Sequence, residues 1–339
     1  MSKVLVTGGS GFVAIHVIDQ LLNSGHEVRT TVRSAAKQQV VLDMLHQAGN
    51  THVDRLSFAI ADLVQDAGWN AACAGCEYVL HVASPMFATK NPDDMMKPAI
   101  DGVLRVLRAA RDAGVRRVVY TSTCGAIYYG HPPQTTSFDE TYWTNTDSAA
   151  MSLYVRSKAL AERAAWDFMA REGGSMEFTT VNPAGIFGPA LGPDYSESLT
   201  LIKQLVEGSM PAVPDLWLCI VDVRDVADLH LRAMTAPEAA GQRFIASEGD
   251  SHSLREVARV LRERLGMHGA KIPTRALPTF IVRIMARFNQ QLADLAPLLG
   301  NRRNATGAKA MRMLGWKPRA WQDAVTDTAK SLLQLGIVK

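Results

Sequence analysis

A tyrosine and a lysine stand four residues apart, at Tyr154 and Lys158. On a helix this spacing puts both side chains on one face, where they can act on one bound molecule. A phenol has a pKa of about 10 and is a poor proton shuttle at neutral pH until a nearby cation stabilises the phenolate. The Lys158 ammonium supplies that charge, and its donors could also hold the ribose of a nicotinamide cofactor. The pair therefore predicts a site that delivers a proton.

A carbonyl oxygen that gains negative charge needs a hydrogen-bond donor beside it. The sequence TST at residues 121–123 offers two hydroxyl groups at the end of an expected strand, on Ser122 and Thr123. Serine and threonine at strand ends often only satisfy a loop, so the sequence leaves both residues open as the catalytic hydroxyl.

A glycine-rich turn near the start of the chain, TGGSGFVA at residues 7–14, links an expected strand to an amphipathic helix. Gly8 permits a tight turn, Gly11 lets the backbone approach a pyrophosphate, and the small Ala14 lets the helix pack closely on a sheet. The free amides at the helix N-terminus then face the phosphates. The residues expected to bind the cofactor here are Thr7, Gly8, Ser10, Gly11, Phe12 and Val13.

The end of the second expected strand favours NADPH over NADH. Proteins that bind NAD usually end this strand with an acid that holds the ribose 2′-hydroxyl, whereas this chain has TTVRS at residues 30–34. Arg33 can meet a 2′-phosphate in a forked contact, and Lys37 follows one helical turn later. Asp62 and Leu63 are expected to flank the adenine. The cleft after the fourth strand is expected to be lined by Val82, Ala83 and Ser84.

These residues must be positioned by an α/β fold. Short β-branched runs alternate with helical-period segments, which is typical of a Rossmann-type, doubly wound parallel sheet. Strands are expected at 3–7, 27–32, 56–61, 78–83, 117–121 and 177–182, and helices at 12–24, 35–48, 93–113, from about 152 past 158, and at 223–234, 254–265 and 280–288. Residues 1–185 are expected to bind the dinucleotide, and residues 186–339 to form a smaller α/β substrate lobe, with possible chain exchange between the two.

Composition narrows the class of protein. A formal charge of +3 with interspersed acids gives no reason to expect nucleic acid or an anionic membrane as a partner. No apolar run reaches the length of a membrane helix. The four scattered cysteines favour a reducing cytoplasm, and the CxxC of Cys73 and Cys76 lacks the further ligands of a zinc site, so no metal is expected.

With these motifs in this order, the chain resembles the extended short-chain dehydrogenase/reductase superfamily. The segments TTVRS, HVASP (81–85), YVRSK (154–158), NPAGIFGP (182–189), VDVRDVA (221–227) and LGWKPR (314–319) are similar to the dihydroflavonol reductase and cinnamoyl-CoA reductase branch. That branch includes bacterial and fungal ketone and aldehyde reductases. The resemblance covers almost the whole chain.

The resemblance implies a reversible NADPH-dependent carbonyl reductase that acts on CH–OH groups, with 4-pro-S hydride transfer. It puts Thr123 in the place of the second serine of the family's TSS, which is a departure from the pattern, and it brings Pro183 and Ile186 close to the nicotinamide. A small ketone or aldehyde is the expected partner, and the chain is expected to be a monomer or a homodimer. An apolar substrate pocket could be walled by Met86, Phe87, Tyr128, Leu191 and Trp217.

Two other functions use similar sequences. A nucleotide-sugar epimerase or dehydratase shares the YxxxK, but its second strand normally ends in an acid and its helix favours YGxSK. A non-catalytic dinucleotide-sensing regulator needs no activated acid, so the presence of Tyr154 and Lys158 argues against it.

Overall fold

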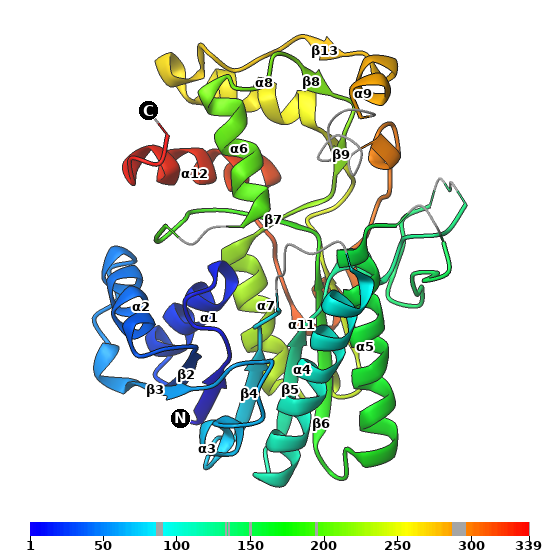
Figure 1. The fold of residues 1–339 in the computed structure, drawn as a ribbon. Helices are drawn as coiled ribbons and strands as arrows, with labels where there is room; N and C mark the ends of the chain where they lie inside the picture. Colours follow the sequence, from blue (N-terminus) through cyan, green and yellow to red (C-terminus); the bar gives the residue numbers. More distant parts are fainter. Residues whose placement is uncertain are drawn as a thin grey trace.

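The computed structural model describes residues 1–85, 91–132, 134, 136–148, 151–193, 196–286 and 296–338. In these residues a seven-stranded parallel sheet forms the first lobe, in the order β3-β2-β1-β4-β5-β6-β11 (Figure 1). Its strands are β1 (Lys3–Val6), β2 (Glu27–Val32), β3 (Leu56–Ile60), β4 (Tyr78–His81), β5 (Arg117–Thr121), β6 (Glu177–Pro183) and β11 (Arg243–Ala246). The expected Rossmann-type fold is confirmed.

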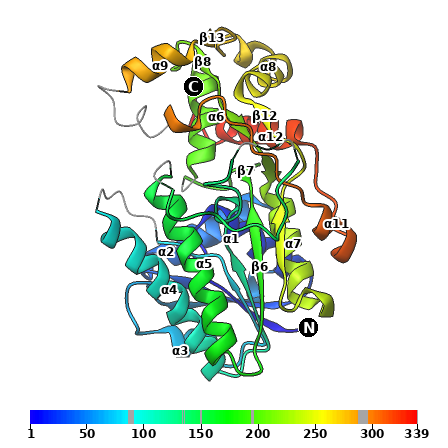
Figure 2. The same cartoon turned by 90° about the vertical axis from the view of Figure 1, so that its right-hand side faces the viewer.

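Helices cover both faces of this sheet (Figure 2). Along β1 the side chains alternate, so that Val4 and Val6 join the apolar cluster of α1 and α7, while Leu5 joins that of α4 and α5 on the opposite face. This two-sided burial explains why the central strands β1, β4 and β5 consist largely of apolar residues. The helices of this lobe are α1 (Phe12–Asn23), α2 (Ala36–Gln47), α3 (Trp69–Cys73), α4 (Pro92–Asp112), α5 (Leu153–Glu172) and α7 (Val223–Thr235).

The second lobe is smaller and combines helices with three two-stranded sheets. Its core gathers Ile202, Leu261 and Leu332 from three helices, and Phe12 of α1 belongs to the same cluster, which ties the glycine turn to this lobe. The paired strands are β7 (Gly185–Phe187) with β10 (Ile220–Asp222), β8 (Val213–Pro214) with β13 (Ala276–Leu277), and β9 (Trp217–Leu218) with β12 (His252–Ser253). The helices are α6 (Glu197–Glu207), α8 (Leu254–Arg264), α9 (Thr279–Met285) and α12 (Trp321–Gln334), whereas α11 (Ala308–Leu314) packs on α7 and β11 of the first lobe.

Residues beyond 185 also complete the first lobe. Strand β11 pairs with β6 as an edge of the sheet, and α7 packs against α1 on one of its faces. The five short 3₁₀ helices described are η1 (Val53–Arg55), η2 (Cys124–Ala126), η3 (Pro237–Ala239), η4 (Gly266–Gly269) and η5 (Ala296–Leu298). The chain therefore crosses between the lobes more than once.

Most element boundaries differ from the sequence expectation by only one or two residues. The largest difference in the sheet is β4, which ends at His81 rather than residue 83, because the amides of Val82 and Ala83 donate to the Thr7 hydroxyl instead of continuing the ladder. Helix α9 accounts for the expected helix at 280–288 up to Met285, and residues 287 and 288 lie outside the described residues.

Within the described ranges, no helix is both long and apolar enough to cross a membrane. The same ranges contain no group of three His, Cys, Asp or Glu side chains that could hold a metal ion. Cys73 and Cys76 are free and buried, and burial raises the pKa of the Cys73 thiol to about 12.

Candidate active site

The carboxyl ends of the strands bring most of the expected site residues to one edge of the sheet. Because the strands are parallel, the turns after β1, β2, β3, β4, β5 and β6 all open at this edge. The strand order reverses between β1 and β4, and in open α/β sheets such a point is where a crevice for ligands forms. The glycine turn, Arg33, Asp62, Ser84, Thr123 and Pro183 all follow or end these strands.

Thr7 locks the glycine turn to the end of β4. Its Oγ1 accepts hydrogen bonds from the amides of Val82 (3.0 Å) and Ala83 (2.9 Å), so its own proton goes to Nδ1 of His81, 2.9 Å away. Burial lowers the pKa of His81 to about 3, which keeps this ring neutral. Gly8 has a φ of +75°, and a Cβ there would lie 3.0 Å from the Cβ of Ala83. The turn after β1 and the turn after β4 therefore approach each other closely at the crevice, with no side chain on Gly8 between them.

The rest of the glycine turn lets α1 begin against the sheet. A Cβ on the buried Gly9 would lie 2.4 Å from Oγ1 of Thr30 on β2, so this position also requires glycine, which the sequence pattern did not reveal. Gly11 is the N-cap of α1, Phe12 begins the helix, and Ala14 is buried under it. Ser10 and Val13 are half-buried. The first-turn amides of α1 point out of the helix N-terminus, which is where a pyrophosphate binds best.

The residues expected around the adenosine end of a cofactor lie beside this turn. Arg33 directly follows β2 and is exposed, and Lys37 lies on the first turn of α2 and is half-buried. Asp62 follows β3, where its carboxylate accepts a hydrogen bond from the amide of Val64 (3.2 Å). Leu63 is buried against Gly102 of α4. A 2′-phosphate next to β2 would therefore meet an arginine and no strand-end acid.

Tyr154 and Lys158 lie in the first two turns of α5, whose N-cap is Ser152. The Tyr154 side chain is 43% exposed, whereas Lys158 is buried and its Nζ donates to the carbonyl oxygen of Thr121 (3.1 Å). Burial lowers the pKa of Lys158 to about 8, and the nearby Glu162 carboxylate opposes this shift. The lysine is therefore fixed to the end of β5 while the tyrosine reaches outward.

The two hydroxyl groups after β5 have different surroundings. Ser122 is buried, and its Oγ donates to the carboxylate of Glu162. Thr123 is half-buried, and its Oγ1 accepts a hydrogen bond from the amide of Gly125 (3.0 Å), which leaves its proton for another acceptor. A Cβ built on Gly125 would lie within 3.5 Å of both Thr123 and Val155, so the Thr123 side chain lies beside the first turn of α5.

Sequence reasoning missed Glu162, Asn182 and Arg243, which lie behind the site. Asn182 Nδ2 donates to Glu162 (2.7 Å) and to the carbonyl oxygen of Thr123 (3.2 Å), and Arg243 Nε donates to Glu162 (2.7 Å). One signal was available, because residues 154, 158 and 162 repeat the same four-residue spacing on one helix face.

The remaining expected residues do not form one described pocket. Pro183 is buried at the end of β6, Ile186 is half-buried on β7, and Val82, Ala83 and Ser84 are half-buried after β4. Leu191 and Tyr128 are half-buried against the main apolar cluster. Trp217 hydrogen-bonds Asp215 (2.9 Å), and its ring is covered by the Arg302 guanidinium at 3.5 Å. Met86 and Phe87 lie outside the described residues.

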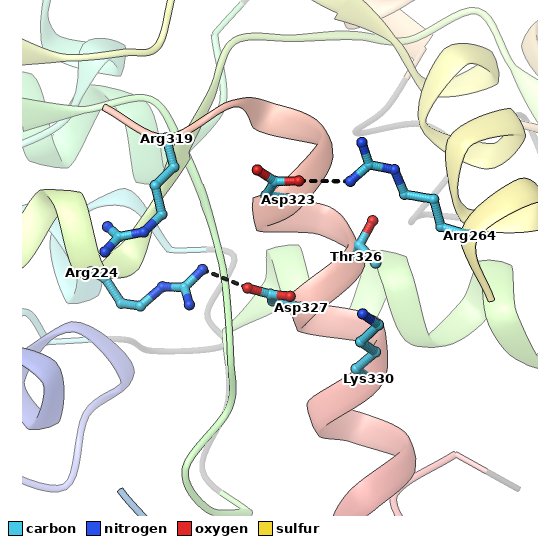
Figure 3. A pocket seen from close by; sticks show the side chains of 7 residues that line it. All are labelled: Arg224, Arg264, Arg319, Asp323, Thr326, Asp327 and Lys330. Atoms are coloured by element: carbon cyan, nitrogen blue, oxygen red, sulfur yellow. Dashed lines mark hydrogen bonds and ion pairs between the residues drawn. The ribbon is translucent and has the colours of Figure 1, made fainter. Parts of the chain in front are cut away.

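A surface cavity of about 480 Å³ lies elsewhere, where α12 meets α7 and α8 (Figure 3). Figure 3 shows Asp323 and Asp327 of α12 reaching Arg264 and Arg224, each pair 2.7 Å apart. Arg319, which also lines it, pairs with Asp225. The arginines that line this cavity are all paired with carboxylates, and these ion pairs connect α12 to α7 of the first lobe and to α8 of the second. None of the expected site residues line the cavity.

Comparison with known proteins identifies the family. Residues 4–246 match the NAD dependent epimerase/dehydratase family, so the chain belongs to that family of extended short-chain dehydrogenases/reductases. Within it, the chain is an NAD(P)-dependent reductase of the dihydroflavonol reductase and cinnamoyl-CoA reductase branch, as its motifs indicated.

The relatives support this branch over much of their length. Cinnamoyl-CoA reductase CAD2 of Medicago truncatula is 34% identical over 77% of this chain and 80% of its own. Dihydroflavonol 4-reductase of Hordeum vulgare is 34% identical over 77% and 74%. Among solved structures, yeast methylglyoxal/isovaleraldehyde reductase Gre2 complexed with NADPH is similar with a TM-score of 0.80 at 27% identity, over 98% of this chain and 99% of that one.

Proposed function

We propose that this protein is an NADPH-dependent carbonyl reductase that reduces a ketone or aldehyde to an alcohol, and that the reaction is reversible. The observation that carries the proposal is the grouping of Tyr154, Lys158 and Thr123 at the carboxyl edge of the sheet, beside the crevice where the glycine turn opens. A relative with a similar fold, the yeast reductase, was solved with NADPH, which supports the same cofactor here.

The residues at the crevice fit a dinucleotide. The backbone of Gly8 approaches Ala83 too closely for a side chain, and the N-terminus of α1 offers amides for a pyrophosphate. Arg33 and Lys37 would hold a 2′-phosphate, and Lys158 the nicotinamide ribose. Asp62 and Leu63 would lie at the adenine, and Pro183 and Ile186 near the nicotinamide. When bound, NADPH supplies the hydride that adds to the carbonyl carbon of the substrate.

Two side chains act on the carbonyl oxygen, and a third supports one of them. Thr123 Oγ1 donates a hydrogen bond to this oxygen, because its hydroxyl accepts from the Gly125 amide and keeps its proton for the substrate. Tyr154 Oη transfers its proton to the same oxygen, which yields the alcohol. The Lys158 ammonium stabilises the phenolate left on Tyr154. Ser122 is less suited to this role, because its hydroxyl is directed at Glu162.

The two parts of the chain have different tasks in this proposal. Residues 1–185 bind the dinucleotide and carry the catalytic side chains, while residues 186–339 bind the organic part of the substrate. Two relatives are named as reductases of cinnamoyl-CoA and of methylglyoxal and isovaleraldehyde, which supports a carbonyl compound as the substrate class.

The replacement Tyr154→Phe tests the mechanism. We expect it to keep NADPH binding but to lower kcat by about 10²- to 10⁴-fold, because the ring remains while the proton donor is lost. The assay follows NADPH consumption with a panel of ketones and aldehydes. Tyr142→Phe is the matched control, because it removes a phenol hydroxyl from a ring that packs edge-on against Phe138 and has no part in the proposed proton transfer.

Two results would contradict the proposal. A Tyr154→Phe enzyme that retains more than about a third of wild-type kcat, with chemistry shown to be rate-limiting, removes Tyr154 from the mechanism. A wild-type protein that binds NADPH but consumes it with no carbonyl compound in the panel favours an epimerase, a dehydratase or a sensor instead.

A further inference from the structure

A buried carboxylate lies directly behind the candidate active site. Glu162 is fully buried on α5, one helical turn beyond Lys158. Its Oε2 accepts hydrogen bonds from Ser122 Oγ and from Asn182 Nδ2 (2.7 Å), and its Oε1 accepts one from Arg243 Nε (2.7 Å). The Asn182 amide nitrogen and the Arg243 guanidinium can only donate, so both carboxylate oxygens of Glu162 act as acceptors here.

These hydrogen bonds connect Glu162 to the residue that carries the catalytic hydroxyl. Asn182 holds the Thr123 carbonyl oxygen (3.2 Å), and the Ser122 amide donates to the carbonyl oxygen of Val181 (2.8 Å). Glu162 therefore clamps the ends of β5 and β6 together at the point where the chain turns towards Thr123. A positional error of about 1 Å at a reacting group can cost around a hundredfold in rate.

Glu162 also contributes a negative charge beside Lys158. The other polar and titratable groups near the Lys158 ammonium are the Thr121 carbonyl oxygen, 3.1 Å from Nζ, the Tyr120 ring at 5.2 Å, the neutral His81 and, one turn away on α5, Tyr154. Burial alone lowers the pKa of Lys158, and Glu162 is the charge that opposes this shift. Arg243 pairs with the Oε1 side of Glu162, at 2.7 Å.

We propose that Glu162 is a positioning residue for the carbonyl reduction: it fixes Thr123 through Ser122 and Asn182, and its charge keeps the Tyr154 and Lys158 pair protonated for proton delivery. This inference rests on the proposed function, because it takes Tyr154 as the acid.

The test is Glu162→Gln, which keeps the size of the side chain and removes its charge. A negative neighbour makes loss of a proton harder, so its removal lets the Tyr154 and Lys158 pair deprotonate at lower pH. We expect the alkaline limb of the kcat profile for ketone reduction to move down by about one pH unit. We also expect kcat at the optimum to fall about tenfold, because Ser122 and Asn182 lose part of their anchor.

The matched control is Glu140→Gln, the same change in a buried carboxylate on another side of Arg243. Glu140 accepts from the amide of Ile245 (2.9 Å), and its carbonyl oxygen accepts from Arg243 (2.8 Å). The alkaline limb of the kcat profile of Glu140→Gln should stay at the wild-type pH. A second control, Glu162→Asp, keeps the charge on a shorter side chain, so the alkaline limb of its profile should also stay at the wild-type pH while kcat falls. Ser122→Ala leaves the charge in place and should lower kcat a few-fold with an unmoved limb.

A second readout does not depend on turnover. The phenolate signal of Tyr154, obtained by ultraviolet titration as the difference between wild type and Tyr154→Phe, should appear at lower pH when Glu162→Gln is introduced into both. Burial raises the pKa of Tyr78 and Tyr120, which separates these phenols from the signal. If wild type reduces no carbonyl compound, the proposed function fails, and this titration still decides whether Glu162 controls the charge of the pair.

The proposal is overturned if Glu162→Gln leaves the alkaline limb and the phenolate titration at the wild-type pH, or if Ser122→Ala retains full kcat. Should Glu162→Gln not fold, the cause would be the unpaired buried arginine, and the double variant Glu162→Gln with Arg243→Met removes it. The alkaline limb of the kcat profile of the double variant should also move to lower pH. If that limb stays at the wild-type pH, the proposal is overturned as well.

Discussion

Arg33→Ala is the sharpest test of cofactor choice. Arg33 directly follows β2, whose neighbour β1 leads into the glycine turn, so a nucleotide in the crevice would present its adenosine ribose near this side chain. The variant removes the proposed fork to the 2′-phosphate and leaves the turn, α1 and the catalytic residues intact.

The expected loss follows from the kind of contact. A hydrogen bond to a charged group contributes about 1.5 to 3 kcal/mol, which corresponds to roughly ten- to a hundredfold in Kd. Because Arg33 is exposed, solvent and salt screen the contact, and we expect a loss near the tenfold end for NADPH. NADH lacks the phosphate, so its Kd should barely change, and the preference for NADPH should shrink.

Fluorescence titration with both nucleotides at low and high salt measures these affinities. The control Arg255→Ala removes an exposed arginine of α8 in the second lobe and should change neither Kd. Lys37 can approach the same phosphate as a point charge, so the double variant Arg33→Ala with Lys37→Ala should lose more than either single change. A wild-type protein that binds NADH as tightly as NADPH would refute the reasoning from the second strand.

Two further predictions concern the catalytic hydroxyl and the glycine turn. Thr123→Ser should remain active and Thr123→Ala should lose at least about a hundredfold in kcat, because the reaction needs the hydroxyl and not the methyl group; if Ser122→Ala is the more damaging change, the roles of the two residues are reversed. Gly9→Ala should lower the melting temperature and weaken NADPH binding, because its Cβ would lie 2.4 Å from Oγ1 of the buried Thr30. The matched control Gly249→Ala, where a Cβ meets nothing within 4 Å, should be close to wild type in both measurements, and equal losses in the two variants would contradict the steric explanation.

The sequence predicted the first lobe well, because its signals are local. Strands such as β1 and β5 are short apolar runs between turns, and helices such as α5 carry a recognisable cap at Ser152. Strand β11 was not predicted, since four residues that join an edge of the sheet from far along the chain have no local signature. The short strands of the second lobe were missed for the same reason. Helices α6, α11 and α12 were not predicted either, whereas α8 and most of α9 were.

The candidate site divides in the same way. The sequence by itself determined three features: the glycine turn, the presence of Arg33 where NAD-binding proteins usually have an acid, and the spacing of Tyr154 and Lys158. Each of these is a pattern within a few consecutive residues. Only the tertiary structure shows that Ser122 and Thr123 have different hydrogen-bond partners. The difference depends on Glu162, 40 residues from Ser122 along the chain, whose buried carboxylate needs donors and accepts a hydrogen bond from the Ser122 hydroxyl. Likewise Arg243 is 81 residues from Glu162 and reaches it only when β11 pairs with β6. The two are found together because a buried charge needs a partner of opposite charge, which can come from any part of the chain.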